Sequence, residues 1–230
     1  MPESTRTRGG PRLVPLDGTN PQTATARPLP SAPTIDGSCT DYAGADIKDN
    51  ATIRLHVGRF NSRAYFCVEV KNDSDADSGL DWGEVLFDQN HTDGSTPSED
   101  DRRFRKTHGG AFEQQKGQSG VWVNCGDACD SSNAAASSLN NSRLTYEFDI
   151  SYLDVWGTSN PAPNEPAAGF AFVGYDNSGD DTYWWGSNTV NENTPSSWGL
   201  LEIPEFQDLV FVFFAIAGVA LSLGRRRRHR

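Results

Sequence analysis

Residues 143–150 read Arg-Leu-Thr-Tyr-Glu-Phe-Asp-Ile, and this stretch predicts the fold class most directly. Polar and apolar side chains alternate along it without a break. In a β-strand successive side chains point to opposite faces of the sheet, so the four apolar side chains share one face. The stretch therefore predicts a half-buried strand whose other face is turned towards solvent.

Similar runs lie on both sides of this strand in the sequence. Ile53, Leu55 and Val57 alternate with polar residues, and the pattern resumes after a polar turn at residues 61–62. Two such runs joined by a short turn predict a β-hairpin. Further short apolar runs occupy residues 85–87, 121–123, 170–175 and 200–203.

Clusters of Gly, Asn, Asp, Ser and Pro separate these runs, and no sustained helical period occurs before residue 204. Residues 32–203 are enough for one domain with its own core, so we expect an all-β, antiparallel β-sandwich there. Residues 1–31 are rich in Pro, Arg and Thr and lack the apolar stretch of a secretion signal. We expect a disordered leader or linker in that range, with a true start further upstream or a longer parent product.

The order of short motifs along the domain carries a resemblance. The motifs are Pro33–Gly37, Asn50–Leu55, Ala64–Asp73, Trp82–Asp88, Glu99–Phe104, Leu144–Ile150, Gly169–Asp176 and Trp198–Leu201. Their succession resembles the family 9 carbohydrate-binding modules and the wider group of DOMON-like sandwiches. The resemblance implies a jelly-roll-like sandwich of two antiparallel sheets, often with bound calcium, that recognises sugar without catalysis through paired aromatic rings.

Tryptophan is the residue type on which such recognition depends, because its flat ring stacks on the C–H face of a sugar. Trp82 stands where the family often places one wall of its sugar clamp. The facing wall usually comes from just before the last strand, but residues 190–194 hold no tryptophan, so we expect Trp184 or Trp185 to substitute. One of these neighbours points outward in a strand. The alternative role of every tryptophan is core packing, which we expect for Trp122, Trp156 and Trp198.

An alternating acidic loop is a candidate cation site. Asp73, Asp75 and Asp77 are followed by Gly79 and Asp81, and calcium binds clusters of such oxygen ligands. The loop does not complete an EF-hand. A second candidate loop holds Asp176, Asn177, Asp180 and Asp181. The alternative for both loops is a solvated acidic turn.

The four cysteines are an even number, which permits two disulfides in an exported protein. A local bridge between Cys125 and Cys129 would leave Cys39 to pair with Cys67. Free buried thiols and a metal site are the alternatives, and the C-x3-C spacing without a histidine close in sequence disfavours metal. Four Asn-x-Ser/Thr sequons, at Asn50, Asn72, Asn90 and Asn140, are compatible with a glycosylated surface protein.

The C-terminal tail has three parts, the signature Pro204-Glu205-Phe206, an uncharged apolar run over residues 209–223, and a basic end at residues 225–230. We expect a transmembrane helix over residues 207–224, with the arginines in the cytoplasm and the domain outside. The alternative is a buried helix of a soluble domain. The tail resembles the PEF-CTERM sorting signals of archaeal surface proteins, which implies an archaeosortase-type processing enzyme as a partner.

Charge and motifs exclude several functions. The chain has a formal net charge of −11 at pH 7, which disfavours a nucleic-acid partner. Abundant carboxylates do not by themselves indicate a glycosidase, and Ser119 does not lie in a nucleophile elbow. We therefore expect a non-catalytic carbohydrate-binding module anchored at the cell surface, with calcium as a structural ion. The alternatives are an envelope protein of structural or adhesive function, and an appendage of a polysaccharide-degrading enzyme.

Overall fold

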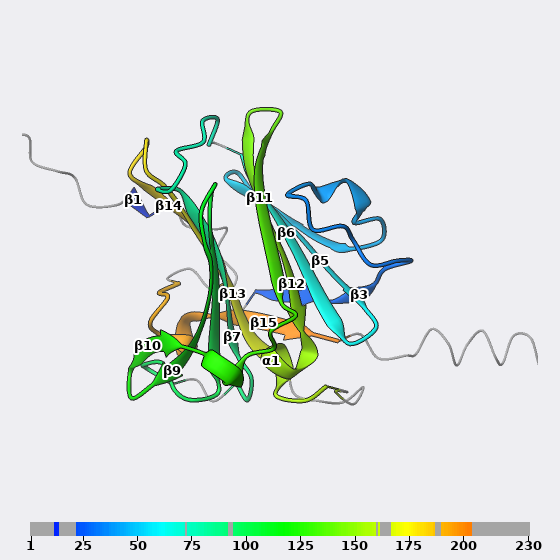
Figure 1. The fold of residues 1–230 in the computed structure, drawn as a ribbon, viewed down its shortest axis with the longest axis vertical. Coiled ribbons are helices and arrows are strands. Elements are labelled where there is room, and N and C mark those ends of the chain that lie inside the picture. The colour runs from blue at the N-terminus through cyan, green and yellow to red at the C-terminus, as the bar shows by residue number, and fades with distance from the viewer. Residues whose placement is uncertain are drawn as a thin grey trace, which may run out of the picture.

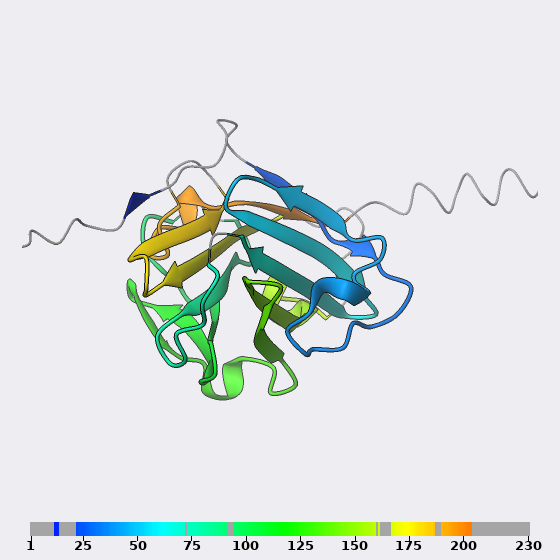
Figure 2. The ribbon, with the colours of Figure 1, turned by 90° about the horizontal axis from the view of Figure 1, so that it is seen from above.

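A computed structural model describes residues 12–13, 22–71, 73–91, 94–159, 161, 167–186 and 190–203. Two β-sheets face each other as the layers of a sandwich (Figures 1 and 2). The nine-stranded sheet has the order β1 (Arg12–Leu13), β14 (Asp181–Trp185), β13 (Ala168–Asp176), β7 (Trp82–Asp88), β8 (Asp101–Thr107), β9 (Phe112–Gln118) and β10 (Val121–Asn124), with β15 (Gly199–Glu202) on β13 and β2 (Thr23–Thr25) on β15. The six-stranded sheet has the order β11 (Ala134–Asn140), β12 (Arg143–Ser151), β6 (Arg63–Val70), β5 (Ile53–Phe60) and β3 (Arg27–Pro28), with β4 (Asp46–Asp49) on β5.

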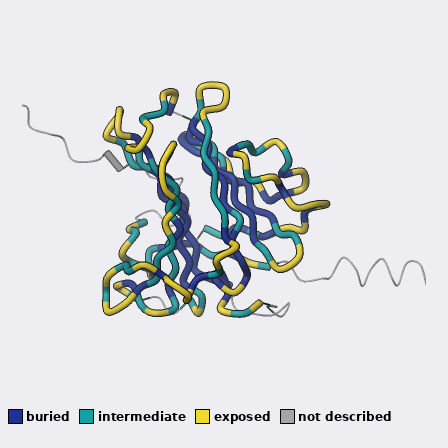
Figure 3. The backbone as a smooth tube through the Cα atoms, in the orientation of Figure 1, coloured by how far each residue is buried: buried dark blue, intermediate teal, exposed yellow. Residues whose placement is uncertain are grey.

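Strand β12 confirms the predicted strand and its apolar face, but the other face is not turned towards solvent, because Thr145 and Glu147 on it are buried as well. Its four apolar side chains, Leu144, Tyr146, Phe148 and Ile150, are at most 1% exposed. From the neighbouring β6, Phe66 lies against Phe87 and Phe170 of the opposite sheet, with ring centroids 5.4 and 5.1 Å apart. These rings interlock the two layers, and Figure 3 shows the buried strands between exposed loops.

The N-terminal boundary of the domain lies earlier than predicted. Residues 22–31, expected in a disordered leader, contain β2 and β3, and Ala24 and Ala26 are fully buried. Each of these short strands adds in parallel, β2 to β15 and β3 to β5, as β1 does to β14. The sheets are therefore mixed rather than purely antiparallel. A run of Pro, Thr and Arg hides this pattern in the sequence because the strands are only two or three residues long.

The chain between β3 and β4 covers the outer face of the six-stranded sheet. Leu29, Tyr42 and Ala45 form a second apolar cluster with Tyr65 and Cys67 of β6. This explains why β6 is buried on both faces although its sequence alternates. The chain includes the 3-10 turn η1 (Cys39–Asp41).

Glycine at position 37 allows this covering segment to approach β11. Its φ is +85°, and a Cβ there would lie 2.8 Å from the backbone nitrogen of Ser138. The backbone N–H groups of Asp36 and Gly37 donate to the fully buried carboxylate of Glu147, each at 2.9 Å. Burial raises the pKa of Glu147 to about 7, against the effect of these hydrogen bonds.

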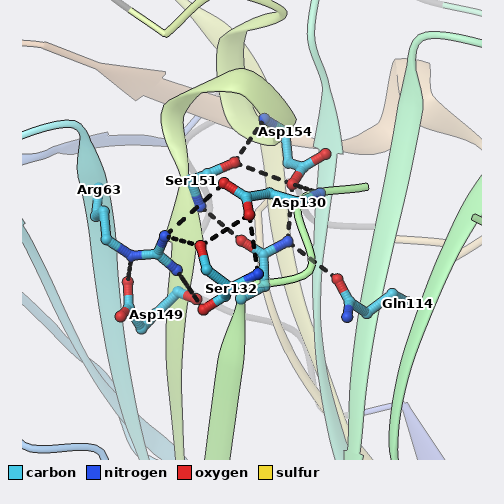
Figure 4. A network of polar contacts seen from close by, with 8 residues as sticks. Arg63, Gln114, Asp130, Ser132, Asp149, Ser151 and Asp154 are labelled. Carbon is cyan, nitrogen blue, oxygen red and sulfur yellow. Dashed lines mark hydrogen bonds and ion pairs between the residues drawn. The ribbon is translucent and has the colours of Figure 1, made fainter. Parts of the chain in front are cut away.

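A polar network ties the sheets together beside the short helix α1 (Tyr152–Trp156) (Figure 4). Asp154, 1% exposed, accepts hydrogen bonds from Asn133 and from the backbone of Asp130. Asn133 also donates to Gln114 of β9, which belongs to the other sheet. Arg63 of β6 contacts Asp149 and Ser132 in the same network.

Both predicted disulfides are present. Cys39 of η1 is bonded to Cys67 of β6, and Cys125 is bonded to Cys129 around η2 (Gly126–Ala128). The predicted transmembrane segment 207–224 and the motif at Pro204–Phe206 lie outside the described residues. Within the part of the chain that the structure describes, no helix has the length and hydrophobicity of a membrane span.

Candidate functional site

The outer face of the nine-stranded sheet carries a group of aromatic and charged side chains. Phe104 of β8 points into the core, so Arg103 and Arg105 on either side of it point outward. The cross-strand register places Glu84 of β7 opposite Arg105 and Trp82 two residues further along the same face. The face therefore combines residues from adjacent strands that lie far apart in the sequence.

Trp82, the tryptophan predicted as a sugar wall, is partly exposed on this face. The guanidinium carbon of Arg105 lies 3.9 Å from the centroid of its ring, a cation–π contact. Tyr175 of β13 is its partner in the strand register, and the two rings stack with centroids 5.9 Å apart. Trp82 is thus oriented by neighbours on both adjoining strands.

A second tryptophan lies on the same face. Trp122 of β10 is partly exposed and stacks on the buried Trp198, with centroids 6.4 Å apart and planes inclined by 10°. Arg103 lies over its ring at 5.1 Å, and its indole nitrogen donates to Asn193 at 3.0 Å. Trp122 was predicted as a core residue, but only part of it is covered. The signal missed was its place on β10, the edge strand of the sheet, beyond which no further strand of the sheet covers its side chain.

Two glutamates lie between the arginines. Arg105 donates to Glu84 at 2.7 Å and to Glu192 at 3.1 Å, and Arg103 lies 3.9 Å from each carboxylate. Glu84 is fully buried, and desolvation raises its pKa to about 7 despite the two guanidinium groups. The group Trp82, Glu84, Arg103, Arg105, Trp122 and Glu192 is called the tryptophan–arginine face below.

Residues 190–194, which precede the last strand, lie at this face as the resemblance implies for that segment. Glu192 contacts both arginines, and Asn193 accepts the hydrogen bond from Trp122. The segment thus supplies a carboxylate and an amide in place of a ring. Guanidinium, carboxylate and amide groups beside partly exposed rings are suited to bind hydroxyl groups of a ligand that stacks on those rings.

The predicted pair Trp184 and Trp185 does not supply a second exposed ring. They alternate in β14 as expected, with Trp184 paired to Val173 and Trp185 packed on Phe170 in the core. Both are only 2% exposed, however, so neither offers a free ring face. The physical reason is that β14 lies beside the most buried strand of the sheet, β13, where outward side chains are also covered.

The two predicted acidic loops meet at one place. Carboxylate oxygens of Asp73, Asp75 and Asp176 lie within 4.8 Å of one another. Asp73 is 1% exposed, its Oδ1 has no hydrogen-bond partner, and burial together with the charge of Asp176 raises its pKa to about 8. Asp77 stands apart and accepts a hydrogen bond from Asn177. Asp75 is exposed and, like Asp176, accepts a hydrogen bond from Ser178. Converging carboxylates that include one buried oxygen without a donor fit a hard cation such as calcium.

Comparison with known proteins supports the fold. Two structures of a family 9 carbohydrate-binding module from Caldicellulosiruptor kristjanssonii, one with cellotriose and one with glucose, are similar to this chain with TM-scores of 0.58 and 0.54 and identities of 15% and 17%. They cover 80% and 79% of this chain and 94% and 95% of their own. A putative carbohydrate-binding protein from Bacteroides uniformis is similar with a TM-score of 0.54 and 11% identity, over 80% of this chain and all of its own. No family model and no curated protein matches the sequence.

Proposed function

We propose that the domain is a non-catalytic carbohydrate-binding module and that it binds glycan at the tryptophan–arginine face. The observation that carries this proposal is the pair of partly exposed tryptophans on one outer face, with hydrogen-bonding groups between them. The fold similarity supports it, because the modules named above were solved with cellotriose and glucose. Trp122 replaces the buried pair Trp184 and Trp185 as the second ring.

Binding would proceed by stacking and hydrogen bonding. A sugar ring stacks its C–H face on Trp82 or Trp122, and burying this apolar surface contributes most of the affinity. The side chains of Arg103, Arg105 and Glu192 then hydrogen-bond to the hydroxyl groups. Because these three are held in mutual ion pairs, their orientation is fixed before the ligand arrives, which reduces the entropy lost on binding.

The test is a binding titration of the full chain with glucose and cellotriose, followed by a glycan array. Calorimetry on Trp82→Ala and Trp122→Ala should show at least a tenfold weaker affinity than the unmodified protein, since a lost aromatic stacking contact is worth about 1.4 kcal/mol or more. Leu80→Ala is the matched control, because Leu80 is an exposed apolar residue two positions from Trp82. Unchanged affinity in both tryptophan variants, or a folded protein that binds no glycan on the array, contradicts the proposal.

A second function is favoured by one contact. Arg105 already lies on a face of the Trp82 ring at 3.9 Å, which leaves that face closed to a ligand. The sandwich is then an envelope protein of structural or adhesive function without sugar binding. Arg105→Ala distinguishes the two, because a glycan site that uses the Arg105 side chain loses affinity in this variant. A protein that binds no glycan with or without Arg105 supports the second function.

Calcium is the structural ion we propose for Asp73, Asp75 and Asp176, and the charge of the buried Asp81 also acts on Asp73. The ion would neutralise carboxylates at the base of the strand that carries Trp82. By binding one ion, these aspartates would hold together the ends of β6, β7 and β13. Isothermal calorimetry with calcium should show binding that Asp73→Asn removes, and a titration without heat in the unmodified protein contradicts the proposal.

We also propose that the tail anchors the domain at the outer side of a membrane. The support is the sequence pattern at residues 204–230, an apolar run between a Pro-Glu-Phe signature and terminal arginines. Processing by an archaeosortase-type enzyme belongs to the same proposal. The full chain should sediment with lipid vesicles whereas a chain that ends at residue 203 should stay in solution, and equal sedimentation of the two contradicts anchoring.

A further inference from the structure

The disulfide Cys39–Cys67 lies beside a histidine and a glutamate on the outer face of the six-stranded sheet. His56 of β5 is the direct cross-strand partner of Cys67 of β6, and Glu69 follows two residues later on the same face. A sulfur of Cys39, a ring nitrogen of His56 and an oxygen of Glu69 all lie within 4.8 Å of one another. Cys39 is bonded to Cys67, so a second sulfur lies next to this cluster.

The histidine of this cluster has no hydrogen bond of its own. His56 is 9% exposed, and neither of its ring nitrogens has a hydrogen-bond partner. Its Nε2 lies 3.5 Å from Glu69 Oε1, beyond the usual distance of a well-formed hydrogen bond. Burying a polar ring without a partner is unfavourable, so an unsatisfied nitrogen close to a sulfur and a carboxylate calls for an additional ligand.

Glu69 is prepared to act as a ligand through one oxygen. Its Oε2 accepts a hydrogen bond from Arg143 at 2.9 Å, which leaves Oε1 directed towards His56. Metal-binding carboxylates commonly carry such an outer hydrogen bond, which fixes their orientation. A cavity of about 480 Å³, lined by Cys39, Glu69 and Arg143 among others, gives solvent access to the cluster.

We propose that reduction of the Cys39–Cys67 disulfide creates a binding site for Zn²⁺ or a similar thiophilic cation, with Cys39, Cys67, His56 and Glu69 as its four ligands. Two thiolates, one imidazole and one carboxylate match the number and type of ligands that zinc takes in tetrahedral sites. The two thiolates and Glu69 leave a bound Zn²⁺ with one net negative charge, which Arg143 balances. The acidic loop at Asp73 offers oxygen ligands only, so it selects a different class of ion.

The disulfide and the metal are then alternative crosslinks at one place. A phosphine reduces the disulfide by transferring two electrons to the sulfurs, and becomes a phosphine oxide with oxygen from water, while the sulfurs take two protons. Metal binding releases those protons to solvent as the thiols become thiolates. In a reducing compartment the cation would hold η1 against β6, and in an oxidising one the disulfide would do so.

The experiment uses Co²⁺ as a spectroscopic probe in the full-length C125A/C129A variant, with calcium in excess to occupy the acidic loop. After phosphine reduction we expect one equivalent of Co²⁺ to give a near-ultraviolet thiolate-to-cobalt band, and Zn²⁺ to displace it. The oxidised sample should give no band. His56→Gln and Glu69→Gln should each weaken Co²⁺ affinity by at least tenfold.

The matched control is C39A/C67A, in which reduction frees only Cys125 and Cys129. A band of equal affinity in this control, or an affinity unchanged by His56→Gln, overturns the proposal because thiolates alone would then explain binding. Circular dichroism covers the case in which reduction unfolds the chain, since the proposal requires the metal to restore the native spectrum. A reduced chain that is folded without a band, or that stays unfolded with metal, also overturns it.

Discussion

Glu84 lies fully buried between Arg103 and Arg105, and the pKa of its carboxyl is raised to about 7. Desolvation is the largest cause, and it exceeds the attraction of the two guanidinium groups. This balance is common for buried ion pairs, whose attraction does not always repay the loss of hydration. At neutral pH the carboxyl of Glu84 is therefore close to its pKa. Both arginines also form ion pairs with Glu192.

The raised pKa has a definite sign for stability. Between pH 4.5, the ordinary value for glutamate, and pH 7 the folded state binds more protons at Glu84 than the unfolded state does. The free energy of unfolding therefore falls as the pH rises through this window. Glu84→Gln removes the titrating group. In urea unfolding, the fall in unfolding free energy over this window should therefore be smaller in the variant than in the unmodified protein, by on the order of 3 kcal/mol.

The control for this prediction is Glu192→Gln, which changes a carboxylate that contacts the same two arginines. The charge of Glu192 raises the pKa of Glu84, so this variant should keep the fall in unfolding free energy over the same window but with a smaller size, whereas Glu84→Gln removes the contribution of Glu84 itself. Because Asp73, Asp101 and Glu147 also have raised pKa values, only the difference between variant and parent isolates Glu84. Parallel pH profiles of Glu84→Gln and the parent would show that Glu84 does not titrate in this range.

Among the elements, β12 and the β5–β6 hairpin could be predicted from the sequence because their apolar residues alternate with period two over eight or nine residues. β2 and β3 could not, because two or three residues carry no period. A local sequence pattern also does not show which other element covers a side chain that points outward from its strand. Trp122 and Trp184 both point outward, yet the element beyond each strand decides that one stays partly exposed and the other is buried.

The candidate site divides in the same way. Trp82 and the acidic loop could be placed from the sequence because each is a local motif. The joining of Asp73 with Asp176, or of Arg103 with Glu192, depends on the cross-strand arrangement, which brings together residues about 100 positions apart. Charge gave no signal for Arg103 and Arg105, since surface strands commonly carry arginines.

The two disulfides constrain elements of different size, which gives a prediction at this scale. Cys39 and Cys67 are separated by 28 residues and join η1 to β6, whereas Cys125 and Cys129 are separated by 4. A disulfide removes more entropy from the unfolded chain when the loop it closes is longer. C39A/C67A should therefore lose about 3–4 kcal/mol of unfolding free energy and C125A/C129A about 2 kcal/mol. Urea denaturation in the absence of added metal measures both. Equal losses would show that strain or denatured-state structure, and not loop length, determines the contribution.

At the scale of the whole molecule, polar groups of the two sheets meet at both ends of β6. Arg63 begins this strand and belongs to the network of Asp149 and Ser132 that lies beside α1 (Figure 4). Asp73 follows the other end, where it meets Asp176 from the nine-stranded sheet. The first end is satisfied by hydrogen bonds. The second is a meeting of like charges, so the sandwich should be weakest there when no cation is bound.

Asp73→Asn should therefore change stability in opposite directions with and without calcium. The pKa of Asp73 is raised to about 8, so at pH 7 in a chelator the unmodified protein must either keep Asp73 protonated or tolerate its buried charge. Its free energy of unfolding falls as the pH rises from 3.8, the ordinary pKa of aspartate, towards 8. The amide removes this penalty, so the melting temperature of the variant should exceed that of the parent by about 2–8 °C. In excess calcium the order should reverse, because the variant lacks a ligand and gains no stability from the ion.

Asp180→Asn is the matched control, because Asp180 is an exposed acid of the neighbouring turn and hydrogen-bonds only to Tyr175 among the described contacts. Its melting temperature should follow the parent in both conditions. Calorimetric melts with chelator and with calcium measure all three proteins. If Asp73→Asn melted below the parent in chelator too, its carboxylate would stabilise the fold as a hydrogen-bond acceptor, and the repulsion between the sheets at this end would be too small to matter. A reversal of order confined to Asp73 would instead establish that one ion joins the two layers at the end of the sandwich where Trp82 begins its strand.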